Sequence, residues 1–208
     1  MMRKYLLGFA VFVLSFGVFL VSALHSSPSK AFTLKPSTPQ PIPSQTPQVN
    51  YAMSFPGGIL PDNPLWNLKA ARDWTWYYIT VDPLKKAELA LLFSDKRLAA
   101  SKTLFKNKKA DIAVTTFTKG EKYLEVAFSE EEIARKDGKD TSDFLIKLAT
   151  ASLKHRQMTE NDLLPLAPED AKPEIIKEEV YAKTTYKSCL YILNSKGITA
   201  PKDPFNGQ

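Results

Sequence analysis

The stretch "TVDPLKKAELALLFSDKRLAASKTLFK", residues 80–106, indicates the fold class of this 208-residue chain. Asp82 followed by Pro83 is typical of a helix start, because an Asp side chain caps free N–H groups and proline is tolerated in the first turn. The apolar residues that follow recur at helical spacing, namely Leu84, Ala87, Leu91 and Leu98. More apolar residues lie beside this stripe, so the helix predicted over 83–107 needs partners on more than one side.

The same periodicity predicts four more helices, over 64–79, 110–135, 141–158 and 169–195. Asn63 is expected to cap the first of them. Gly120 lies in the middle of another, where it allows either a kink or a close approach of a neighbouring helix. Strand patterns are nearly absent. We therefore predict an all-α fold, a helical bundle of about five helices over 55–197, followed by a flexible tail over 198–208.

The N-terminal segment, 1–25, reads as a signal-anchor. Residues 5–24 carry no charge and are long enough, as a helix, to cross the hydrocarbon layer of a membrane. Arg3 and Lys4 precede them, which predicts a cytoplasmic N-terminus and an extracytoplasmic body. Signal cleavage near the "VSA" of residues 21–23 is the alternative, and it would leave the rest secreted.

Residues 26–54 are rich in Pro, Ser and Thr and predict a disordered linker that separates the anchor from the helical domain. Cys189 is the one cysteine of the chain, so no internal disulfide forms. Its helical spacing from Tyr186 and Leu193 predicts a small buried residue.

Four quoted stretches resemble a family of bacterial and archaeal exported helical domains of unknown function. They are "LPDNPLWNLK" (60–69), "TVDPLKKAELALLFSDKRLA" (80–99), "LKHRQM" (153–158) and "APEDAKPEIIKEEVYAKTTYKSCL" (167–190). The resemblance extends over 56–195, and the first two stretches are its most specific part. It implies an all-helical exported domain with an N-terminal anchor and carries no activity. The chain departs from it at "WTWYY" (74–78), where charged or aliphatic residues are common.

Residues with the spacing of a metal or catalytic site are not apparent. The two histidines, His25 and His155, are isolated in the sequence, and we expect His155 to lie on a helix surface or at a cap. The acidic loop that includes Asp137 and Asp140 lacks the ligand spacing of a calcium loop. We expect neither a cofactor nor a metal, and no enzymatic activity.

Basic residues gather at the end of the helix predicted over 83–107. They are Lys96, Arg97, Lys102, Lys106, Lys108 and Lys109. Such a group attracts polyanions in a salt-dependent manner, and outside the cell these are anionic wall polymers, lipid headgroups or extracellular DNA. The alternative is that these cations complement the helix dipole and keep the domain soluble.

Aromatic residues crowd the helix predicted over 64–79. They are Trp66, Trp74, Trp76, Tyr77 and Tyr78. We favour a core role, in which the tryptophans pack against the helix predicted over 83–107. A partner-binding patch is an alternative. A membrane-interface belt is another, although the linker separates these residues from the anchor.

These features together predict a membrane-anchored, extracytoplasmic, non-catalytic helical module of the cell envelope. We expect it to bind or organise a protein partner or an anionic cell-wall polymer, and not intracellular nucleic acid. A sensory or regulatory exodomain and an enzyme with an unrecognised site are the alternatives.

Overall fold

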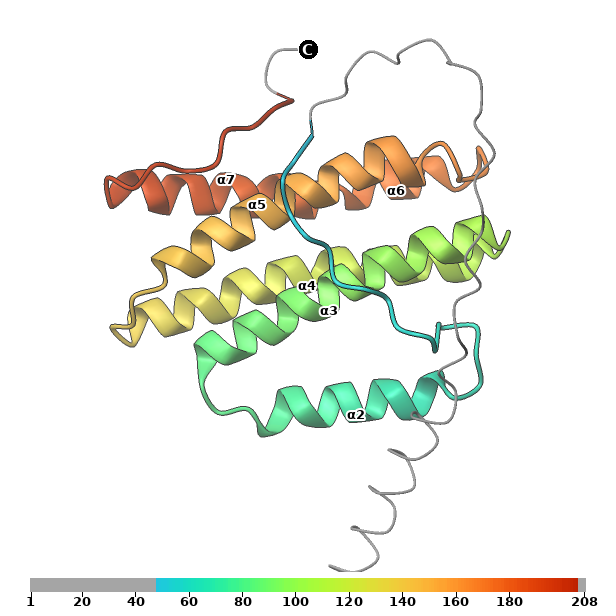
Figure 1. Ribbon diagram of the computed structural model, residues 1–208, viewed down its shortest axis with the longest axis horizontal. Coiled ribbons are helices and arrows are strands. Elements are labelled where there is room, and N and C mark those ends of the chain that lie inside the picture. The colour runs from blue at the N-terminus through green and yellow to red at the C-terminus, as the bar shows by residue number, and fades with distance from the viewer. Residues whose placement is uncertain (1–47, 206–208) are drawn as a thin grey trace, which may run out of the picture. The chain divides into compact units, whose positions relative to one another are not determined.

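The computed structural model describes residues 48–205, which belong to one compact unit (Figure 1). Its helices are α2 (Trp66–Ile79), α3 (Pro83–Lys106), α4 (Ala110–Lys136), α5 (Ser142–Met158), the π-helix η1 (Thr159–Leu163), α6 (Lys172–Glu178) and α7 (Val180–Ser195). No strand occurs in this part of the chain, so the predicted all-α class is confirmed. The predicted anchor and most of the predicted linker lie outside the described residues.

The predicted helices agree closely with the observed ones. Only the last is divided, because Glu179 separates α6 from α7. Asp82 caps α3 as expected, since its carboxylate accepts the N–H groups of Leu84 at 2.8 Å and Lys85 at 3.3 Å. The expectation that Asn63 caps α2 is wrong, because Leu65 occupies the N-cap position without a side-chain cap bond. Asn63 instead accepts the N–H of Leu65 at 2.9 Å in the preceding turn, and the helix begins slightly later than predicted.

Helix α4 occupies the centre of the bundle. It packs along α3 and also against α5, α6 and α7, while α5 packs on α7 (Figure 1). The core fills the space between these helices with buried residues such as Leu91, Leu124, Leu148 and Leu193. Cys189 is buried in the same cluster, as its spacing predicted. In contrast, α2 lies at the edge of the bundle, with α3 as its principal helical neighbour (Figure 1).

Gly120 lies at a close approach of α3 and α4. A Cβ atom at this position would lie 3.2 Å from Cβ of Arg97 and 3.4 Å from the carbonyl oxygen of Ser94. The Ser94 hydroxyl donates to the Gly120 carbonyl at 2.8 Å across the same contact. The glycine therefore serves the close approach, which decides between the two roles that the sequence left open.

The C-terminal segment packs against the helices over its described part. The Tyr186 hydroxyl donates to the carbonyl of Pro201 at 2.7 Å, and the Phe205 ring is buried with the Arg156 guanidinium 4.3 Å from its centre. The sequence predicted a flexible tail here. Apolar side chains and one buried ring hold residues 198–205 in place instead.

The helices from Trp66 to Ser195 are each too short or too polar to cross a membrane, and residues 48–205 contain no other candidate. The prediction of a membrane-spanning helix over 5–24 concerns residues outside this range.

Replacement of Gly120 by Leu is expected to lower the free energy of unfolding by about 1–3 kcal/mol, because the added side chain meets the α3 backbone at this close approach. Urea unfolding followed by circular dichroism measures this change. Gly58→Ala is the control, since no atom lies within 4 Å of a Cβ at that position. Equal stability of the Gly120→Leu protein and the wild type would contradict the close packing.

Candidate functional site

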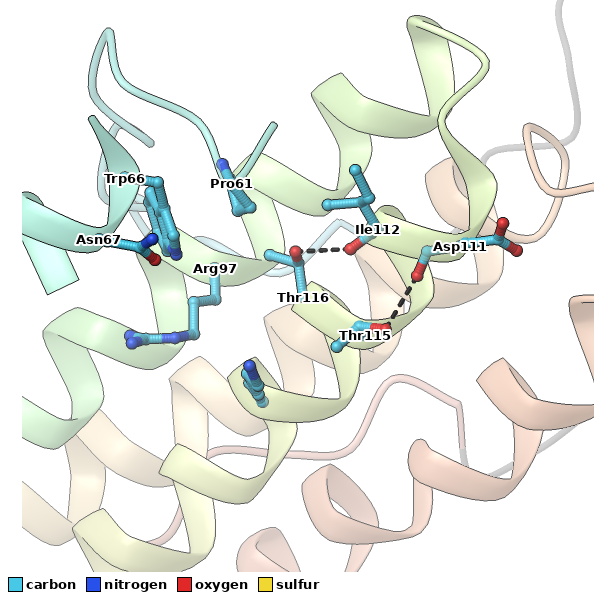
Figure 2. Close-up of a pocket in the computed structure, with 9 residues that line it drawn as sticks. Pro61, Trp66, Asn67, Arg97, Asp111, Ile112, Thr115 and Thr116 are labelled. Carbon is cyan, nitrogen blue, oxygen red and sulfur yellow. Dashed lines mark hydrogen bonds between the residues drawn. The ribbon is translucent and has the colours of Figure 1, made fainter. Parts of the chain in front are cut away.

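A cleft of about 340 Å³ opens where α2, α3 and α4 meet (Figure 2). The turn before α2 and its first residues form one wall, α3 contributes a single arginine, and the first turns of α4 form the other wall. The lining residues are Pro61, Trp66, Asn67, Arg97, Asp111, Ile112, Thr115, Thr116 and Lys119. The close approach at Gly120 positions the cleft, because it brings Arg97 of α3 beside the α4 wall.

Arg97 is the unusual group of this cleft. Its guanidinium is partly buried, lies 4.4 Å from the centre of the Tyr123 ring, and donates one bond of 3.3 Å to the Phe93 carbonyl. Its Nε is buried without a hydrogen-bond partner, and among residues 48–205 no carboxylate forms an ion pair with it. Burial lowers the pKa of Arg97 from its ordinary value, a sign that the cation is poorly compensated.

Lys69 adds a second cation beside Arg97. Its Nζ donates to the carbonyls of Pro56 at 3.0 Å and Ile59 at 2.9 Å, and it lies 4.7 Å from the centre of the Trp66 ring. Burial lowers the pKa of Lys69, with Asp73 opposing the shift. Three neighbouring cations lower it further, namely Lys96, Arg72 and Arg97. Positive charge is therefore concentrated on this side of the bundle.

The acidic groups nearby offset this charge only in part, because Asp73 raises the pKa of Lys69 and of Arg97 but forms an ion pair with neither. Asp73 is bound to Arg72 at 2.6 Å. Asp111 lies at the opposite end of the cleft from Arg97 (Figure 2). The hydroxyls of Thr115 and Thr116 donate to backbone carbonyls of α4, so each has already used its proton (Figure 2).

The donors left for a ligand are therefore cationic or amide groups. The buried Nε of Arg97 has no acceptor, the Lys119 ammonium lines the same cleft, and the Asn67 amide faces it from α2. Such a set of donors suits a phosphate or carboxylate oxygen, which accepts strong charge-assisted hydrogen bonds.

The structure divides the six basic residues that the sequence grouped together. Arg97 lines the cleft and Lys96 lies near it, whereas Lys102 is paired with Asp162 at 3.0 Å and faces η1. The last three, Lys106, Lys108 and Lys109, lie at the exposed turn between α3 and α4, where Lys109 pairs with an aspartate. Sequence reasoning missed Lys69 and Lys119, because their proximity to Arg97 depends on the packing of three separate helices.

The preferred interpretation of the α2 aromatics as core is wrong for most of them. Trp74 is 61% exposed and Tyr78 is 72% exposed, and Trp76 is exposed as well. Trp66 and Tyr77 are partly buried, and the Tyr77 hydroxyl donates to Glu130 at 2.6 Å.

The exposure of the α2 aromatics follows from the direction in which each side chain leaves the helix. Its inward face is centred on Asp73, and the neighbouring Trp74 is turned about 100° away from that face. Because α3 covers only one side of α2, the other aromatics remain outside.

His155 is completely buried, and the expectation of a surface or capping histidine is wrong. Its Nδ1 lies 2.8 Å from Oε1 of Glu121 on α4, and its Nε2 lies 3.1 Å from Oδ1 of Asp95 on α3. The other Asp95 oxygen accepts the hydroxyls of Tyr51 at 2.9 Å and Ser54 at 3.4 Å. One imidazole therefore joins three helices and, through Asp95, the segment that precedes α2.

The two carboxylates favour the protonated ring. Burial alone would lower the pKa of His155, but charge attraction to Glu121 and the hydrogen bonds with both carboxylates raise it to about 9. The ring is consequently an imidazolium at neutral pH. Both ring nitrogens are occupied, which leaves neither available to a substrate.

No group of three or more His, Cys, Asp or Glu side chains within residues 48–205 is arranged to hold a metal ion. The buried Asp95, His155 and Glu121 are arranged in a line, with the ring between the carboxylates, and do not converge on a common point. A second cavity of about 270 Å³ borders Tyr51, Ser54 and Asp95, whose polar atoms already bond to one another.

Fold and cleft together define a helical domain with an aromatic edge helix and an uncompensated basic cleft. Residues 58–164 match the family described as "Domain of unknown function (DUF5667)". This match covers just over half of the chain, which therefore belongs to that family. It includes the cleft and His155, but ends before α6, short of the range 56–195 over which the sequence showed its resemblance. No curated protein and no solved structure matches the chain.

Trp74→Ala is expected to change the free energy of unfolding by less than about 1 kcal/mol, because the exposed ring loses little buried area. Phe93→Ala is the contrasting substitution. The Phe93 ring is buried and contacts Trp76 and Tyr123 edge-on, so its loss is expected to cost about 3–5 kcal/mol. Thermal and urea unfolding of both variants measures the difference. Comparable losses would show that Trp74 is part of the core.

His155 is expected to make stability dependent on pH. Its folded pKa of about 9 lies above the ordinary value of 6.5, so its stabilisation is complete below pH 6.5 and is lost as the pH rises through 9. The full loss is on the order of 3 kcal/mol. Urea unfolding from pH 6 to 10 measures it, with His155→Gln as the reference for all other titrating groups. The imidazole NMR titration of the folded protein provides a second measurement, and a midpoint below 6.5 would contradict the ion pair.

Proposed function

We propose that this chain is a membrane-anchored, extracytoplasmic, non-catalytic module, and that the cleft between α2, α3 and α4 binds an anionic group of an envelope polymer. The observation that carries the proposal is Arg97, a partly buried cation whose Nε has no hydrogen-bond partner and which forms no ion pair with a described carboxylate.

A buried cation without a partner destabilises a fold, since it loses hydration and gains no compensating ion pair. Residues that oppose stability in this manner concentrate at functional sites. An anionic ligand would supply the missing partner. It would also meet Lys119 in the same cleft and Lys69 close by.

The shape of the site supports a small anionic group on a longer molecule. The cleft is open to solvent and bounded by the Trp66 ring and the Ile112 side chain, so it does not enclose a whole ligand. A polymer that carries repeated phosphates or carboxylates presents one group to the cleft while the rest of the chain passes along the basic surface. The predicted location outside the membrane makes wall polymers of this kind accessible.

The arrangement of His155 favours a binding role over a catalytic one. Its two nitrogens are both engaged by carboxylates, and the ring is completely buried away from solvent. The charged ring therefore helps to hold α3, α4 and α5 together, and neither of its nitrogens is free to transfer a proton to a ligand.

Arg97→Gln is expected to weaken the binding of inorganic polyphosphate, used as the probe, by about tenfold or more, because one charge-assisted hydrogen bond is worth about 1.5–3 kcal/mol. The same variant is expected to be as stable as the wild type or more stable, since it removes a desolvated cation. Binding is measured on the full chain in zwitterionic nanodiscs as a function of salt, and stability by urea unfolding.

Lys187→Gln is the matched control, because it removes one exposed positive charge on α7, away from the cleft. It is expected to leave polyphosphate binding almost unchanged. Equal losses in the two variants would reduce the interaction to general electrostatic attraction. Undiminished binding of polyphosphate by the Arg97→Gln protein would exclude the cleft as the binding site. Binding of a folded protein partner in place of the polymer would identify that partner as the ligand.

A further inference from the structure

We propose that the outer face of α2 is a lipid-binding surface that lies on the headgroup layer of an anionic membrane. The inference goes beyond the proposed function and does not depend on the ligand of the cleft. It rests on the exposure of apolar side chains, on the way α2 satisfies its own polar groups, and on the charges beside it.

Exposed apolar side chains are concentrated on α2 and at its ends. Seven of the fourteen large apolar side chains that are exposed within residues 48–205 lie between 65 and 81. They are Leu65, Leu68, Trp74, Trp76, Tyr78, Ile79 and Val81, of which Trp76 lies on the side of α2 toward α3, where it contacts Phe93 edge-on. An apolar group of this kind on a protein surface marks a place of interaction, whereas single exposed apolar residues do not.

The rings on this face are arranged as one surface. Trp74 and Tyr78 are stacked with their centres 5.1 Å apart, one helical turn from each other. Leu68 and Ile79 share a neighbouring exposed side of the helix, with Ile79 about 100° around from Tyr78. Tryptophan and tyrosine are the residues that favour the membrane interface, because each combines a large apolar ring with one polar atom.

The hydroxyls of the two threonines at the outer side and the end of α2 are already satisfied within the helix. Thr75 donates to the Ala71 carbonyl at 2.8 Å, and Thr80 at the helix end donates to the Trp76 carbonyl at 2.8 Å. Helices in contact with lipid need such internal partners, because the bilayer offers no hydrogen bonds of its own. The face can therefore be desolvated without leaving these hydroxyls unpaired.

The charges of α2 suit an anionic surface. Its one acidic residue, Asp73, is buried and bound to Arg72, so the helix presents no exposed carboxylate. Lys69 and Arg72 on α2 lie close to Lys96 and Arg97 of α3, and this group of cations borders the apolar face. An apolar face with cations along its margin is typical of helices that lie in the plane of a membrane.

A lipid surface explains this combination better than a second copy of the chain. Two copies packed through the same face would bring two identical groups of cations to one interface, where α2 has no free carboxylate to meet them. Anionic headgroups provide the opposite charge. The segment 25–47 has a contour length of at most about 80 Å, so the predicted anchor keeps the domain near lipid.

The tryptophans provide a direct test, because the three in the chain, Trp66, Trp74 and Trp76, are all on α2. The full chain is placed in nanodiscs that contain anionic lipid with bromine atoms near the top of the acyl chains, which quench nearby indole rings. We expect quenching of tryptophan emission and a shift to shorter wavelength. Both effects should decrease with zwitterionic lipid and with rising salt.

Two variants with one tryptophan each locate the contact. W66F/W76F retains the exposed Trp74, and W74F/W76F retains the partly buried Trp66 beside the cleft. We expect several-fold stronger quenching of Trp74 than of Trp66. Absence of quenching in the wild type, or equal quenching of the two rings, would overturn the proposal. A blue shift that depends on protein density in unbrominated vesicles and not on lipid charge would assign the face to a second copy and would also overturn it.

Failure of this test is distinguishable from failure of the proposed function, because polyphosphate binding is measured separately in zwitterionic discs. If the protein binds polyphosphate but brominated lipid does not quench its tryptophans, the cleft is supported as a binding site and the lipid-binding surface is excluded.

Discussion

The ion pair of His155 with Asp95 and Glu121 is the contact on which the rest of the structure depends. It joins the middle of α3 and of α4 to the last turn of α5, although these parts are far apart in the sequence, and it is completely buried. Breaking such a network by removing one member leaves an uncompensated charge inside the protein. Asp95 also accepts the Tyr51 hydroxyl, so the segment that leads to α2 is held by the same carboxylate.

The position of the cleft follows from this central contact. With α3 and α4 held together there, Gly120 allows the two backbones to approach closely, and Arg97 is placed at their boundary. The buried carboxylates of Asp95 and Glu121 are already bound to His155, and the α4 wall offers the arginine no carboxylate at ion-pair distance. Its uncompensated charge is thus a consequence of the same close packing that stabilises the bundle.

The sequence predicted the elements of this fold because the signals for them are local. The Asp82–Pro83 pair specifies the start of α3 wherever the helix packs, and apolar periodicity marks α4 and α5 in the same way. The cleft was only partly predictable. Arg97 was singled out for its charge, but Lys69 and Lys119 join it through tertiary packing. For His155 the sequence shows one isolated histidine, and its partners lie 60 and 34 residues away.

The aromatics of α2 show a different limit of sequence reasoning. Periodicity identifies which residues share a face, but it does not tell whether another element covers that face. The bundle covers only the side of α2 that carries Asp73 and Tyr77, and leaves Trp74 and Tyr78 in solvent.

Arg97 without an ion-pair partner and the exposed face of α2 are two disagreements between sequence and fold in the described chain. Both disagreements lie at one edge of the bundle, where α2 meets α3 and α4. A fold that satisfied only its own stability would pair the cation and cover the rings. Because α2 contributes Trp66 to the cleft and Trp74 to the outer face, a ligand in the cleft and a surface beneath the helix would act on the same element.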